Sequence, residues 1–242
     1  ILNSIQFKAQ APEPQRTDFK VLTLGEFMSE TYESTESIIE SFLSRNQVLI
    51  LGGDTGVGKT WGGLQCALSI ASGVPLFGHF KIKKMKTLLI QFENENDDIR
   101  RRLELMTPHF IQKSASTDWQ ENLLVCPMNP DDEIFVDNWK RIEETLIKTG
   151  YRDGVLIVDN MYTSTDKNIQ DNNELKQLMR IIHRIRKLYN LTIILVAHAN
   201  KGVQEQQDLH YDQLQGGKVL ASQVSNIFQM HSSSTSVDLR VA

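Results

Sequence analysis

Residues 53–60 read Gly-Asp-Thr-Gly-Val-Gly-Lys-Thr, which fits the phosphate-binding pattern of a glycine, four variable residues and Gly-Lys-Thr. The apolar run 48–51 leads into this stretch, and residues 61–71 follow it with a helical pattern. A strand, a glycine-rich turn and a helix in this order direct exposed N–H groups towards one anion. A chance glycine turn has no reason to carry both flanks. The stretch therefore predicts a site for a nucleoside triphosphate.

The predicted loop also assigns roles to its last two residues. Lys59 is expected to reach the outer phosphates, and the hydroxyl of Thr60 is expected to bind Mg²⁺. We therefore expect ATP and Mg²⁺ as cofactors. The predicted ATP contacts are consecutive in the chain: Gly53, Asp54, Thr55, Gly56, Val57, Gly58, Lys59, Thr60 and Trp61.

The composition narrows the class of protein. Hydrophobic residues make up 40% and charged residues 23% of the 242 residues, which is ordinary for a globular chain. The two cysteines have no metal-ligand spacing, and no apolar run approaches the length of a membrane span. A net charge of −4 argues against a broad surface that coats nucleic acid, but it leaves a narrow groove or a shared channel open. We expect a cytoplasmic protein without membrane contact.

The order of apolar segments predicts the fold. Residues 1–20 are expected to form an N-terminal arm, and residues 21–242 one ATPase domain whose native sequence continues further. Residues 23–47 predict one or two short helices, and apolar runs at 48–52, 88–92, 155–159 and 192–198 predict strands that alternate with helices. This alternation predicts an α/β fold with a mostly parallel, doubly wound central sheet flanked by helices. The serine run 232–236 predicts a hairpin turn, and hence antiparallel strands at the C-terminus.

Two acidic residues end predicted strands and are candidates for metal binding and catalysis. Asp159 ends the run 155–159, so its carboxylate is expected beside the loop, where it would hold Mg²⁺ through water. The next residue is Asn160, although many ATPases place a water-activating glutamate there. Glu93 ends another strand at the carboxyl edge of the sheet, and we predict it to be the general base. Glu95 is the competing candidate, and a helix-capping role is the structural alternative.

His198 ends a fourth predicted strand at the same edge. A lone histidine is usually satisfied by a backbone group, but here the ring is placed to contact the γ-phosphate. Lys201 and Lys218 are the remaining nearby cations, and either is a candidate to supply charge to the nucleotide of a neighbouring subunit.

Landmarks along the chain resemble the RecA-like P-loop ATPases, in the branch that contains RepA-type hexameric plasmid helicases and standalone relatives. The resemblance covers about residues 21–230 and keeps the order of the motifs. Its segments are VLTLGEFMSE, IIESFL, LGGDTGVGKT, ALSIASGVPLFGHFKI, TLLIQFENENDDIRRRLELM, VLIVDN, IILVAHANK and GGKVLASQVSNIF.

The resemblance implies roles for particular residues. Glu93 matches the catalytic glutamate of the family and His198 its γ-phosphate sensor, while Lys218 falls where relatives insert a cation across a subunit interface. It also implies a homo-oligomeric ring or filament with ATP between subunits. Residues 166–173 and 200–217 would then face a channel for single-stranded DNA. Asn94 and Asn160 depart from the residues that many relatives carry.

We interpret the chain as an ATP-hydrolysing RecA-like motor domain for DNA replication, repair or mobile-element maintenance, with helicase activity as an option. One alternative is a regulatory ATPase or ATP-dependent assembly switch without helicase activity. A small-molecule kinase is a weaker alternative, because no lid-like arginine cluster is present. The basic stripe of Arg180, Arg184 and Lys187 is expected to be a solvated helix face, with DNA contact as the alternative.

Overall fold

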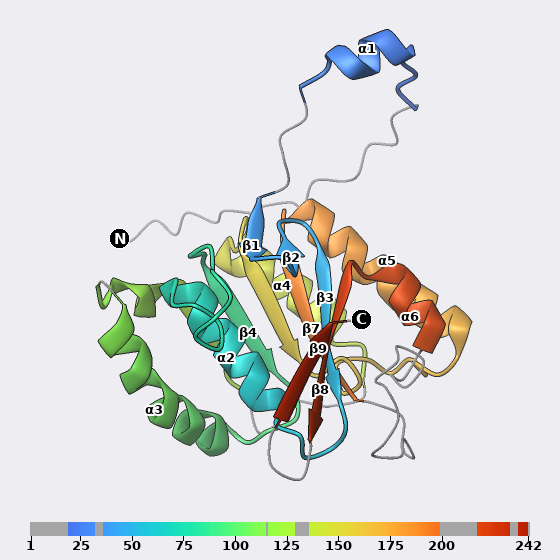
Figure 1. Ribbon diagram of the computed structural model, residues 1–242. Coiled ribbons are helices and arrows are strands. Elements are labelled where there is room, and N and C mark those ends of the chain that lie inside the picture. The colour runs from blue at the N-terminus through green and yellow to red at the C-terminus, as the bar shows by residue number, and fades with distance from the viewer. Residues whose placement is uncertain are drawn as a thin grey trace, which may run out of the picture.

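In the computed structural model, a seven-stranded sheet forms the centre of the molecule (Figure 1). The structure describes residues 19–31, 36–114, 116–128, 136–198, 217–232 and 237–241. Among these, the helices are α1 (Leu24–Ser29), α2 (Lys59–Ser72), α3 (Asn96–Lys113), the 3₁₀ helix η1 (Asp118–Asn122), α4 (Trp139–Thr149), α5 (Asn172–Leu188) and α6 (Gly217–Gln223). The strands are β1 (Ser37–Ile39), β2 (Leu43–Ser44), β3 (Val48–Gly53), β4 (Thr87–Gln91), β5 (Leu123–Cys126), β6 (Val155–Asp159), β7 (Thr192–His198), β8 (Asn226–Ser232) and β9 (Val237–Val241).

The order of strands in the central sheet is β5-β4-β6-β7-β3-β8-β9. All neighbouring strands from β5 to β8 are parallel, and β9 pairs antiparallel with β8. The predicted α/β class, the mostly parallel sheet and the C-terminal antiparallel pair are therefore confirmed. β8 also extends the parallel sheet, because it pairs with β3.

Successive residues of the central strands point to opposite faces of the sheet and fill two cores. On β6, Val155 and Ile157 pack with residues of α2 and α3, whereas Leu156 and Val158 pack with residues of α4 and α5. Figure 1 shows α2 and α3 on one side of the sheet and α5 and α6 on the other. Strands that are buried on both faces explain why these runs are almost wholly apolar.

The segment before β3 differs from the expectation of one or two helices. One helix forms, α1, and a capping box between Thr23 and Glu26 begins it. The remainder forms the antiparallel hairpin of β1 and β2. No residue of α1 is buried, so the domain boundary at residue 20 remains a prediction. Residues 1–18 and 233–236 lie outside the described residues. Within the described ranges, no helix is both long and apolar enough to cross a membrane.

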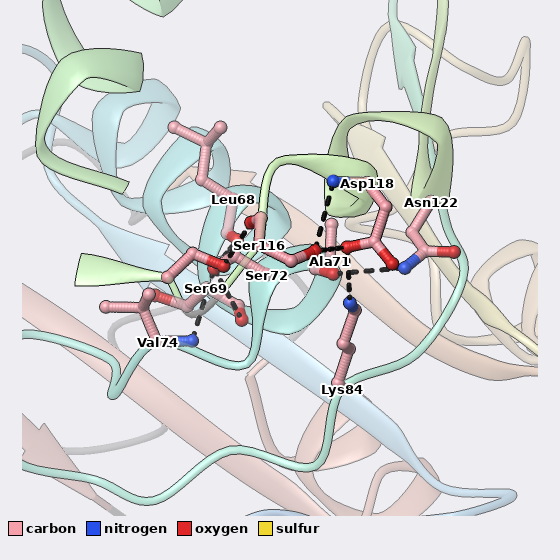
Figure 2. A network of polar contacts seen from close by, with 10 residues as sticks. Leu68, Ser69, Ala71, Ser72, Val74, Lys84, Ser116, Asp118 and Asn122 are labelled. Atoms are coloured by element: carbon pink, nitrogen blue, oxygen red, sulfur yellow. Dashed lines mark hydrogen bonds and ion pairs between the residues drawn. The ribbon is translucent and has the colours of Figure 1, made fainter. Parts of the chain in front are cut away.

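The C-terminal end of α2 is held by a network of polar contacts (Figure 2). Ser72 Oγ donates to the carbonyl of Leu68 at 2.7 Å, and Asn122 Nδ2 donates to the carbonyl of Ala71 at 3.4 Å. Gly73 ends the helix with φ of 80°, and its N–H donates to the carbonyl of Ser69. These contacts anchor the end of α2 that lies away from the phosphate loop.

Candidate active site

The phosphate loop joins the buried strand β3 to the N-terminus of α2, as the sequence predicts. Gly53 has φ of 155°, and a Cβ there would lie 2.5 Å from the backbone oxygen of Met230. Gly58 has φ of 90° and occupies the N-cap position of α2, where no side chain caps the helix. The first N–H groups of a helix have no partner within it, so this end offers donors and a positive dipole to an anion.

Lys59 is the first residue of α2, and its side chain folds back over the loop. Its Nζ donates to the carbonyl of Asp54 at 2.7 Å, and the residue is only 6% exposed. Burial lowers the pKa of Lys59, and the negative charges of Glu93, Asp159 and Asp54 partly offset this effect. Polyphosphate would add negative charge beside an ammonium group that is poorly hydrated, which fits the predicted role.

The remaining loop residues present a mixed surface. Thr55 and Gly56 are exposed, while Val57 is buried against β3 and β8 side chains. Trp61 is 40% exposed on the first turn of α2, and the guanidinium of Arg102 lies 5.7 Å from its ring centroid. All nine predicted ATP-contact residues are therefore contiguous around one helix terminus, and their contacts with ATP remain predictions.

Asp159 lies at the carboxyl end of β6, directly opposite Gln91 on β4. It is completely buried, and its Oδ2 accepts from Gln91 Nε2 at 3.1 Å, whereas its Oδ1 has no hydrogen-bond partner. Burial raises the pKa of Asp159, against hydrogen bonds from Gln91 and Thr60 that lower it. An unpartnered carboxylate oxygen near a threonine hydroxyl is a donor set that suits Mg²⁺. The residues present thus fit the predicted metal.

Glu93 and His198 meet at the same edge of the sheet, beside the phosphate loop. His198 pairs in register with Gly53, and its Nε2 lies 3.6 Å from Glu93 Oε2. Glu93 is within the electrostatic reach of Lys59, and hydrogen bonding to His198 is the largest cause that lowers its pKa. Glu93 therefore stays ionised at neutral pH, as a carboxylate that accepts a proton must be.

Other predicted residues lie outside this cluster. Lys218 is exposed on α6, on the face of the sheet opposite α2, and the described residues show no contact between it and the cluster. Glu95 occupies the N-cap position of α3 and is exposed. Lys201 and the loop 200–216 lie outside the described residues. The role of Lys218 across a subunit interface remains a prediction.

Two buried side chains complete the site, and the sequence reasoning gave neither of them a role. Gln91 holds Asp159, and Asn160 contacts both Glu93 and His198. A polar glutamine inside the otherwise apolar run 88–92 was the available signal for the first. For Asn160 the signal was its place directly after the strand-ending aspartate.

Comparison with known proteins agrees with this arrangement. A family model described as "AAA domain" matches residues 11–204. Among solved structures, 678 chains match, including one whose title describes it as an "ATPase Domain". That structure has a TM-score of 0.57 and 14% sequence identity, and the match covers 82% of this chain and 77% of that chain. No match was found among curated proteins. The structural likeness shows a shared RecA-like fold.

Proposed function

From the premise that this chain belongs to the AAA-domain family of P-loop ATPases, we propose that it binds ATP with Mg²⁺ and hydrolyses it to ADP and phosphate at residues 53–61 and the facing strand ends. The observation that supports this most directly is the cluster of Lys59, Asp159 and Glu93 at one edge of the sheet. The ends of two strands and one helix terminus deliver these charges to the same place.

The chain's own residues divide the work of hydrolysis. The backbone of the loop and Lys59 bind the β- and γ-phosphates, while Thr60 and Asp159 hold the metal, which supplies neutralisation of phosphate charge. Glu93 accepts the proton of the attacking water. His198 lies between Glu93 and the loop, where it would sense whether the γ-phosphate is present.

Replacement of the general base tests the assignment. Glu93→Gln keeps the shape of the side chain but removes the proton acceptor, so we expect a decrease in kcat of about 100- to 10,000-fold. ATP binding, measured with a fluorescent ATP analogue, should stay within a factor of about three of the unmodified protein, because the phosphate loop is intact. Glu95→Gln is the matched control and should leave kcat unchanged. Full turnover by Glu93→Gln would refute this assignment of the catalytic base.

We further propose that the ATPase is a DNA-directed motor that assembles as a homo-oligomer with ATP at the subunit interfaces, in replication, repair or mobile-element maintenance. The RecA-like fold supports this proposal, and Lys218, exposed on α6, is available to reach the nucleotide of a neighbouring copy. The test combines the mass of the particle in solution with the ATPase rate, with and without single-stranded DNA. A monomer whose rate does not respond to DNA contradicts the motor.

One observation favours a second candidate, an ATP-dependent assembly switch without helicase activity. In the predicted DNA-facing loop 166–173, Ile169 is buried in the core and Asp171 caps α5 by accepting from two backbone N–H groups. Lys167 is the one cation of that loop, so phosphate neutralisation there is limited. On α5, Arg184 is paired with Glu143, which reduces the basic stripe available to DNA. Oligomerisation that depends on ATP but not on DNA would favour the switch.

A further inference from the structure

Asn160 follows β6 directly and is completely buried beneath the candidate active site. Its Nδ2 donates to Glu93 Oε2 and also lies 3.0 Å from His198 Nε2. A single amide group therefore touches the predicted general base and the predicted phosphate sensor. These two residues lie at strand ends that are separated by β6 in the sheet.

Neighbouring groups determine which way this amide points. Asn160 Oδ1 accepts from the backbone N–H of Thr163 at 2.9 Å and from its hydroxyl at 3.1 Å. A backbone N–H can only donate, so the oxygen of the amide must face Thr163. The NH₂ group is then directed at Glu93 and His198. The turn after β6 thus sets the orientation of the donor without any contribution from bound nucleotide.

The contact restrains one oxygen of a side chain that is otherwise accessible. The Glu93 side chain is 40% exposed, so in isolation it would sample several rotamers at the mouth of the site. His198 Nε2 can either accept from Asn160 or, when protonated, donate to Glu93, so it holds Glu93 in only one of its protonation states. The amide has no such alternative, because it donates at any pH. Asn160 is therefore the constant restraint on Glu93.

We propose that Asn160 is a positioning residue for hydrolysis: its amide holds Glu93 Oε2 so that the remaining carboxylate lone pairs face the attacking water. The inference rests on the proposed function, in which Glu93 is the general base. Fixing a base in its reactive geometry is a recognised source of rate, and misplacement by about 1 Å costs about 100-fold. The amide acts on catalysis only through Glu93.

The experiment measures kcat and ATP affinity separately for three replacements of Asn160. Asn160→Ser keeps a short donor, Asn160→Ala removes it, and Asn160→Asp keeps the size and the acceptor for the Thr163 N–H but places a carboxylate beside Glu93. We expect kcat to fall about 10-fold, about 30-fold and about 100-fold in that order, because the restraint is progressively lost and then replaced by repulsion. The affinity for a fluorescent ATP analogue should change less than about three-fold.

Two controls separate positioning from a general structural effect. Asn122→Ala removes another partly buried asparagine, which contacts the far end of α2, and should leave kcat unchanged. In a Glu93→Gln background, Asn160→Ala should cost nothing further, since the amide acts only through Glu93.

The outcomes are distinct. Wild-type kcat in Asn160→Asp, or equal losses of affinity and kcat in every Asn160 variant, overturns the inference. If the alanine variant does not fold, the serine and aspartate variants decide by the same criteria. Turnover that survives Glu93→Gln counts against the proposed function. Loss of turnover in Glu93→Gln with full activity in Asn160→Asp counts against the positioning role alone.

Discussion

The two ends of α2 solve the same chemical problem in opposite ways. Every helix leaves N–H groups at its start and carbonyls at its end without partners inside the helix. At the C-terminal end, the carbonyls of Leu68, Ser69 and Ala71 all accept hydrogen bonds from neighbouring groups (Figure 2). At the N-terminal end, Gly58 provides no side-chain cap.

The difference shows which end is committed to stability and which to binding. A capped end contributes to the free energy of folding but has nothing left for a ligand. An uncapped end keeps its donors and its dipole for an anion, at some cost in stability. Changes at the N-terminal end should therefore alter nucleotide affinity with little loss of stability. Changes at the C-terminal end should do the reverse.

The largest expected effect is at the binding end. Lys59→Met removes the ammonium group but retains an unbranched side chain, so we expect ATP affinity to fall about 100-fold, or ~3 kcal/mol. Thermal stability without nucleotide should not decrease, because the buried ammonium is already poorly hydrated there and its pKa is lowered by burial. Titration with a fluorescent ATP analogue and a thermal melt measure the two quantities.

Lys84→Met is the matched control, because Lys84 pairs with Asp118 at 3.4 Å beside the other end of the same helix. It should leave ATP affinity unchanged. If Lys59→Met bound ATP as tightly as the control, the binding role of the N-terminal end would be disproved.

A smaller effect is expected where α2 ends. Gly73 has φ of 80°, and a Cβ there would lie 3.3 Å from Lys84 Cβ. Gly73→Ala should therefore destabilise the protein by about 1–2 kcal/mol, since L-residues disfavour this backbone conformation. Chemical denaturation measures the change, and ATP affinity at low temperature should be unaltered. Gly25→Ala, in α1 with open space around it, is the control that should show no such loss.

The same contrast explains how far the sequence could be read. The strand, loop and helix at residues 48–72 carry local signals, and the predicted strands 155–159 and 192–198 agree with β6 and β7. Both are apolar runs that end at polar residues. Such patterns depend on neighbours in the chain and need no knowledge of distant contacts.

Residues whose role depends on distant partners were harder to predict. Ile38, Ile39, Phe42 and Leu43 are spaced as on one face of a helix, yet they lie in and around the β1–β2 hairpin. There Ser41 has φ of 67° and the Glu40 N–H donates to the carbonyl of Lys81.

The site shows the same limit, because local pattern reveals a residue's position but not what it will face. Gln91 meets Asp159 across 68 positions of sequence, and Asn160 meets Glu93 across 67. The fold could be predicted from periodicity. The contacts between strand ends follow only from the order of strands in the sheet.

The smallest effect tests the capped end by a single contact. Asn122→Ala removes the donor to the Ala71 carbonyl, a partly buried hydrogen bond of 3.4 Å. We expect a loss of about 0.5–1 kcal/mol in the free energy of unfolding, because a long bond contributes little and the freed carbonyl can reach water. ATP affinity should be the same as in the unmodified protein. Since the helix is continuous, altered affinity in this variant would mean that its two ends are coupled, and the division between a stabilising end and a binding end would not hold.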